Sequence, residues 1–204
     1  MYDDAGFANQ PTSVLPGSSG LGSSWDDGDD SSPLTDEPVR TGPQWHFGLD
    51  LGLLVLRVAI GVFFLAHGAQ KLFGWFDGPG MDGAEQMLAG FGFTEPGILV
   101  WVTALSETIG GALLVLGLFT PAGAAMVLGV MANVIVVKFA RADFLAGVEL
   151  EMTYAAAAFA LLFTGPGRFA LDRHTHWWRK APVYGFVFLV LTAGATVVTL
   201  VVFR

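Results

Sequence analysis

The sequence predicts an all-α membrane protein: four transmembrane helices in a bundle, a fifth transmembrane helix at the C-terminus and a disordered N-terminal tail. The chain of 204 residues is 53% hydrophobic and 14% charged, which is too apolar for an ordinary water-soluble domain. Its apolar residues gather in runs of roughly 20, the length that an α-helix needs to cross a hydrocarbon layer of about 30 Å. The first 45 residues are instead rich in Gly, Ser, Pro and Asp.

The predicted tail covers residues 1–47. Its first 45 residues contain eight acidic residues and one arginine, which account for most of the net charge of -8. Too little contiguous apolar surface is present to offset the entropy of ordering, so we expect disorder. No basic residue precedes the first apolar run, which starts near residue 49, so the tail does not resemble a secretory signal. The rest of the chain is nearly neutral, which argues against binding to nucleic acid.

Five apolar runs are the predicted membrane spans. Four have full length, at residues 49–73, 97–119, 121–140 and 183–203. The run at 150–164 is shorter and spans only if flanking residues extend it. In the turn GLFTP between the second and third spans, Gly117 is expected to end one helix, Thr120 to cap the next and Pro121 to occupy its first position.

The basic residues predict the orientation, because Lys and Arg favour cytoplasmic loops. Residues 48–166 form the predicted four-helix bundle, and residues 167–182 follow as a loop before the fifth helix at 183–204. This loop holds the densest basic cluster in the chain, namely Arg168, Arg173, Arg179 and Lys180. We therefore expect the loop and the N-terminus to be cytoplasmic and the C-terminus to lie outside, in a bacterial plasma membrane. Between the first two spans, residues 82–91 have the apolar spacing of a short amphipathic helix at the outer interface.

Polar residues inside the spans are the candidate functional residues, because ionisable groups at membrane depth are costly. At 100° per residue, one narrow stripe of the first helix contains Arg57, Gly61, Phe64, Gly68 and Lys71, with His67 on its flank. The two glycines favour close approach of another helix. In the second span, Glu107 is the carboxylate that lies deep inside an apolar run.

Two interpretations of these residues are open. In the first, Arg57 pairs with Glu107 as a clamp between helices and Lys71 reaches outward to the lipid headgroups. In the second, Glu107, His67 and Lys71 line a cavity open to the outer leaflet that binds the head of a quinone. Whether Glu107 pairs with Arg57 or with His67 stays open. The candidate ligand-binding residues are His67, Lys71, Glu107, Arg57, Trp75 and Asn133. Lys138, Glu149, Glu151 and Tyr154 are expected to complete such a cavity from the outer side.

The chain contains no cysteine. It therefore cannot itself carry a disulfide, a cysteine-ligated iron-sulfur cluster, a covalently attached haem or a thiol relay. His174 and His176 are two residues apart in a loop and no further ligand stands nearby at a recognisable spacing, so no metal site is predicted.

Two segments carry a family resemblance. RVAIGVFFLAHGAQKLFGWFDGPG, followed later by LSETIGGALLVLGLFTP, resembles the DoxX family of small bacterial membrane proteins over residues 49 to about 165. The resemblance implies a four-helix membrane bundle with a partly embedded segment after the first helix. It also implies association with quinone-linked oxidoreductases, such as thiosulfate:quinone oxidoreductase or actinobacterial membrane oxidoreductase assemblies. The matching positions are Arg57, His67, Gly68, Lys71, Phe73, Gly74, Glu107, Gly110 and Gly111. The acidic tail and the fifth span depart from the family pattern.

Three functions are compatible with these features. The first is an accessory membrane subunit of a redox assembly, binding a quinone or a lipid between the first helices, with redox enzyme subunits as partners and without catalysis by this chain alone. The second is a non-catalytic scaffold or assembly factor, and the third is a transporter of small solutes. Membrane lipids are expected partners in each case, and assembly into a homo-oligomer stays open.

Overall fold

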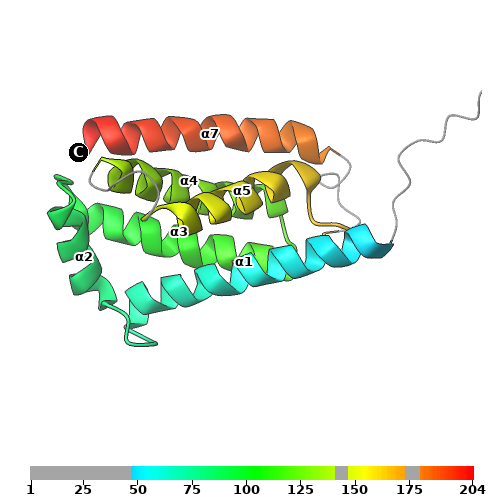
Figure 1. Ribbon diagram of the computed structural model, residues 1–204, viewed down its shortest axis with the longest axis horizontal. Coiled ribbons are helices and arrows are strands. Elements are labelled where there is room, and N and C mark those ends of the chain that lie inside the picture. The colour runs from blue at the N-terminus through cyan, green and yellow to red at the C-terminus, as the bar shows by residue number, and fades with distance from the viewer. Residues whose placement is uncertain (1–46, 141–146, 173–179) are drawn as a thin grey trace, which may run out of the picture. The chain divides into compact units, whose positions relative to one another are not determined.

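The computed structural model describes residues 47–140, 147–172 and 180–204, and every regular element in these ranges is a helix (Figure 1). The helices are α1 (Phe47–Phe73), α2 (Gly80–Gly90), α3 (Pro96–Leu116), α4 (Thr120–Phe139), α5 (Glu149–Thr164) and α7 (Ala181–Val202). Four of them, α1, α3, α4 and α7, are long and apolar enough to cross a membrane. With 16 residues, α5 reaches about 24 Å and is shorter than a full crossing. The predicted disordered tail up to residue 46 and residues 173–179 of the basic loop lie outside the described ranges.

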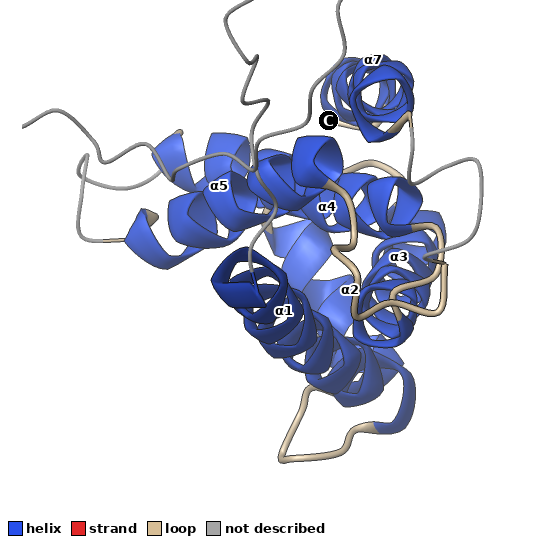
Figure 2. Ribbon diagram, turned by 90° about the vertical axis from the view of Figure 1, so that its right-hand side faces the viewer, coloured by secondary structure: helices blue, strands red, loops and turns tan. Residues whose placement is uncertain are grey.

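The long helices and α5 run back and forth along one direction, and α2 lies across one end of the bundle, as Figure 1 shows. The start of α1 and the end of α7 lie at opposite ends. In the end-on view of Figure 2, α7 is the outermost helix and sits beyond α4 and α5. The expected amphipathic helix after the first span is present as α2, which begins two residues earlier than predicted and buries Ala84. Which end of the bundle faces the cytoplasm remains a prediction.

The contact between α1 and α3 confirms the predicted inward stripe of α1. Arg57, Gly61, Phe64 and Gly68 are all buried. A Cβ atom on Gly68 would overlap the Thr108 hydroxyl oxygen, and one on Gly61 would lie 2.8 Å from the carbonyl oxygen of Gly111. The two backbones therefore approach as closely as glycine allows, which is a common arrangement between membrane helices.

The turn between α3 and α4 agrees with the prediction in one respect and differs in another. Gly117 ends α3 in the left-handed conformation, with a φ of 65°. The expected cap at Thr120 is wrong, because Thr120 is already the first residue of α4 and is fully buried. Phe119 holds the cap position with a φ of 43°, and its backbone N–H donates to the Asp172 carboxylate at 2.8 Å. The acceptor at the start of α4 comes from a loop far along the chain, so the sequence around Thr120 does not reveal it.

We predict that Gly68→Ala lowers the stability of the bundle by about 1–3 kcal/mol, because the added methyl group would overlap Thr108. Thermal unfolding of the protein in detergent measures the effect. Gly52→Ala is the matched control on the same helix, because a Cβ atom added to Gly52 would have no heavy atom within 4 Å. Equal unfolding temperatures for the two variants would show that the close α1–α3 contact does not limit stability.

Candidate functional site: a cavity with two lysine-glutamate pairs

A cavity of about 640 Å³ lies in the bundle, and α1, α2, α3, α4, α5 and α7 all contribute to its lining. Its walls are mainly apolar. Cavities of this volume commonly hold small organic ligands. Four of the six predicted ligand-binding residues line it: His67, Lys71, Glu107 and Asn133. Arg57 and Trp75 are not part of its lining.

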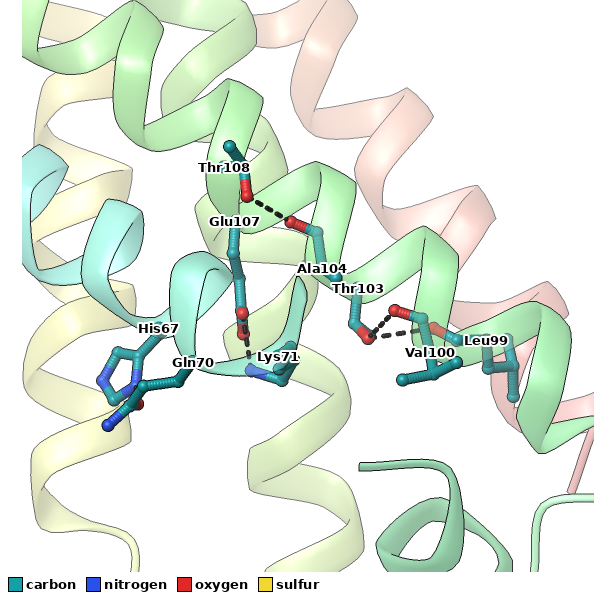
Figure 3. A network of polar contacts seen from close by, with 9 residues as sticks. All are labelled: His67, Gln70, Lys71, Leu99, Val100, Thr103, Ala104, Glu107 and Thr108. Atoms are coloured by element: carbon teal, nitrogen blue, oxygen red, sulfur yellow. Dashed lines mark hydrogen bonds and ion pairs between the residues drawn. The ribbon is translucent and has the colours of Figure 1, made fainter. Parts of the chain in front are cut away.

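Lys71 and Glu107 form an ion pair at this cavity, as Figure 3 shows. The Lys71 ammonium nitrogen donates to Oε2 of Glu107 at 2.5 Å. The Glu107 side chain is 5% exposed and that of Lys71 is 24% exposed. The charge of the buried carboxylate is thus balanced from α1, and part of the Lys71 side chain stays exposed at the cavity.

Because Glu107 pairs with Lys71, the predicted pairings of Glu107 with Arg57 and with His67 are wrong. The expectation that Lys71 reaches outward to the lipid headgroups is wrong as well. The reason is the close crossing of the two helices. A Cβ on Gly68 would lie 3.0 Å from the backbone nitrogen of Thr108, so α1 meets α3 next to Glu107. Lys71 follows Gly68 by three residues and therefore shares its face of the helix. Its side chain then meets the carboxylate before it can reach the lipid headgroups.

His67 lies at the rim of the cavity and is exposed. Its Nδ1 is 3.1 Å from Oε1 of Gln70, and its ring meets that of Phe64 edge-on, with 6.1 Å between the ring centroids. In Figure 3 the ring points away from the Lys71–Glu107 pair. With Oε1 of Gln70 as the acceptor, Nδ1 is the donor of this hydrogen bond, which leaves Nε2 as a hydrogen-bond acceptor.

Arg57 holds the opposite end of the bundle together. Its Nη1 donates to the carbonyl oxygen of Pro166 at 2.7 Å and its Nη2 to that of Phe169 at 2.6 Å. The guanidinium is buried and fixes the loop after α5. Asp50 assists, because its Oδ1 accepts a hydrogen bond from the Arg168 backbone at 2.8 Å. Arg57 is therefore not part of the cavity lining, and the hydrogen bonds that it makes are structural.

Trp75 also lies away from the cavity lining. It is 59% exposed, and its ring contacts two other exposed rings: that of Phe73 is tilted, with 5.2 Å between centroids, and that of Phe76 is edge-on at 6.5 Å. Exposed aromatic rings next to the end of a membrane helix are typical of the membrane interface.

A second ion pair lines the cavity from α4 and α5. Lys138 donates to Oε1 of Glu151 and also to the carbonyl oxygen of Gly147, the latter at 3.1 Å. Both residues of the pair were expected to complete a cavity, whereas Glu149 and Tyr154, which were expected with them, are not among its lining residues. Among the described residues, no three His, Asp or Glu side chains gather closely enough to bind a metal ion. His174 and His176 lie outside the described ranges.

Comparison with known proteins agrees with this architecture. The DoxX family model matches residues 52–140, from the second turn of α1 to the end of α4. A protein of Bacillus subtilis (strain 168) named "Putative oxidoreductase CatD" is 32% identical over 124 residues, which cover 60% of this chain and 86% of that protein. The chain belongs to the DoxX family. It is a multi-pass membrane protein, and α7 follows the part that the family model matches. No solved structure matches the chain.

One functional feature was missed by sequence reasoning. Three threonines of α7, Thr192, Thr196 and Thr199, line the cavity. Their spacing of four and three residues places them on one face of the helix. This pattern was visible in the sequence, but their small hydroxyl groups gave no signal comparable to a buried charge.

We predict that Lys71→Met lowers the free energy of unfolding by about 3 kcal/mol, because it leaves the buried Glu107 carboxylate without its cation. Glu107→Gln should cost less, because Lys71 is partly exposed and keeps access to polar surroundings. In the double variant the loss should be smaller than the sum of the two single losses, as measured by thermal unfolding in detergent. Simple additivity would show that the two side chains do not interact in solution.

Proposed function

We propose that this protein is an accessory membrane subunit of a quinone-linked redox assembly and that its cavity binds the quinone. The single observation that carries the proposal is the polarity of the cavity along the bundle. Lys71 and Lys138 lie in the last turns of α1 and α4, at the end that α2 covers, and Glu107 is paired with Lys71. Toward the other end the lining includes Ala122, in the first turn of α4. A quinone with a polar ring and an apolar chain has this same division.

The length of the cavity supports a ligand that carries a chain. Ala122 and Lys138 both line it, and they are 16 residues apart on the same helix, which corresponds to about 24 Å. A volume of about 640 Å³ spread over such a length describes a narrow passage. A prenyl or alkyl chain fits this form better than a compact solute does.

The charged side chains of the cavity favour a ligand whose head group is neutral. Each cavity lysine is paired with a glutamate, Lys71 with Glu107 and Lys138 with Glu151, so these four groups carry no net charge. An anionic phospholipid headgroup would need an excess of cations, whereas the carbonyl oxygens of a quinone need hydrogen-bond donors. The ammonium group of Lys71 can supply such a donor.

The redox part of the proposal is supported by the relative from Bacillus subtilis, whose name describes an oxidoreductase. Because the chain has no cysteine, we place thiol or iron-sulfur chemistry on partner subunits and assign to this chain the binding of the quinone within the membrane.

Binding of decylubiquinone to the purified protein in lipid nanodiscs tests the proposal. We expect saturable binding to the wild type, and loss of at least tenfold in affinity for Ser106→Phe, which places a ring in the cavity next to Glu107. Leu105→Phe is the matched control, because Leu105 is exposed on the outer face of α3 and does not line the cavity. Absence of binding to the wild type would overturn the proposal.

Extraction from native membranes gives an independent test. Protein purified in mild detergent should carry a quinone at close to one molecule per chain by mass spectrometry, and the Ser106→Phe variant should carry much less. Recovery of phospholipid without quinone, equal in both variants, would contradict a quinone site.

A further inference from the structure

The threonines of α7 are unusual for so apolar a helix. Among the 22 residues APVYGFVFLVLTAGATVVTLVV, the polar side chains are Tyr184 and three threonines, and all three threonines line the cavity. Most of the remaining surface of α7 is exposed, as expected for a face turned to lipid. The three hydroxyl groups therefore share the cavity face of α7. Those of Thr192 and Thr199 donate to the carbonyl oxygens of Ala125 and Ala195, so the hydroxyl of Thr196 is the one that can meet a bound molecule.

The contacts between α4 and α7 place Thr196 at about the level of Asn133, and both residues line the cavity. Phe119 packs on Phe188 with 5.1 Å between ring centroids, and farther along, Thr192 donates to the carbonyl oxygen of Ala125 at 3.3 Å. From the first contact to the second, the residue numbers increase on both helices. The two helices therefore run in the same direction, as Figure 1 also shows. Continuing this register brings Thr196 to the level of Asn133, within about one helical turn.

Both side chains hold a polar atom without a partner. Asn133 Oδ1 and Thr196 Oγ1 are buried and make no hydrogen bond within the described part of the chain. Elsewhere the hydroxyl groups of helical threonines donate to the carbonyl four residues back, as in Thr108, Thr153 and Thr164. Thr196 does not make this local bond. A buried polar atom left unpaired is costly, so these two atoms indicate a missing hydrogen-bonding group at the cavity wall.

We infer that Asn133 and Thr196 form a second polar contact point of the cavity, which binds the ring oxygen of a 1,4-quinone opposite the oxygen that faces Lys71. This inference rests on the proposed function and narrows the ligand to a ring with oxygen atoms on two opposite edges. The Thr196 hydroxyl can donate to a quinone carbonyl, and Oδ1 of Asn133 can accept from the hydroxyl of the reduced quinol. One pair of side chains thus serves both redox states of the ligand.

The contact also gives α7 a role in selectivity. The family match ends at residue 140, so the second contact point combines Asn133 from the matched helices with Thr196 from the helix that follows them. A ligand with a single polar end would satisfy Lys71 and leave both atoms of the second contact point unpaired.

Thr196→Val tests the inference, because valine has nearly the shape of threonine and lacks the hydroxyl group. We expect the affinity for decylubiquinone in nanodiscs to fall about tenfold, the effect of losing one hydrogen bond to a buried group. The affinity for 4-decylphenol, which has one ring oxygen, should stay the same. In a double variant that carries Asn133→Leu as well as Thr196→Val, the affinity for reduced decylubiquinol should fall further than in Thr196→Val alone.

Thr164→Val is the control, because the Thr164 hydroxyl is bonded within α5 and does not line the cavity. Unchanged unfolding temperatures in detergent would show that the binding losses do not come from misfolding. If the wild type binds decylubiquinone and Thr196→Val binds it equally well, the second contact point is wrong while the proposed function stands. If the wild type binds no decylubiquinone, both are wrong.

Discussion

The close crossing of α1 and α3 is the constraint on which the rest of the structure depends. Because lipid gives no hydrophobic driving force for helix association, the helices are held together by close packing of their backbones. Gly61 and Gly111 supply this fit in the middle of the crossing, and Gly68 extends it to the level of Thr108. The ion pair between Lys71 and Glu107 is a consequence, because the carboxylate has a cation within reach only where the helices lie this close. The same crossing therefore fixes both the fold and the polar end of the cavity.

The two ends of the bundle use buried charge in different ways. At one end, Arg57 is bonded to the carbonyl groups of Pro166 and Phe169, an arrangement that fastens a loop and lies away from the cavity lining. At the other end, the charges stand in lysine-glutamate pairs around an open volume. The buried Arg57 thus fixes a loop to a helix, whereas the paired Lys71 and Lys138 line a surface that a ligand can reach.

Much of the fold was predictable from sequence. The apolar runs predicted the helices, and the period of α1 predicted its inward stripe, because both follow from the regular geometry of a helix. The partner of Glu107 was not predictable in the same way. Depth along the membrane normal favoured Arg57 or His67 as the partner of Glu107. The actual partner depends on the crossing angle and the separation of two helices, which a local sequence pattern does not contain. The cap of α4 failed for a related reason, since Asp172 reaches Phe119 from more than fifty residues away. Contacts of this kind depend on tertiary structure.

The position of α7 in the chain has a consequence for biosynthesis. Its threonines form one wall of the cavity, and its last turn is tied back to the start of α3, where the carbonyl oxygen of Phe203 accepts from the backbone of Thr94 at 2.7 Å. Because α7 is the last of these helices to leave the ribosome, the cavity has only its other walls while the chain is being inserted into the membrane. The cavity face that carries the threonines is therefore added only after the chain through α5 has been made.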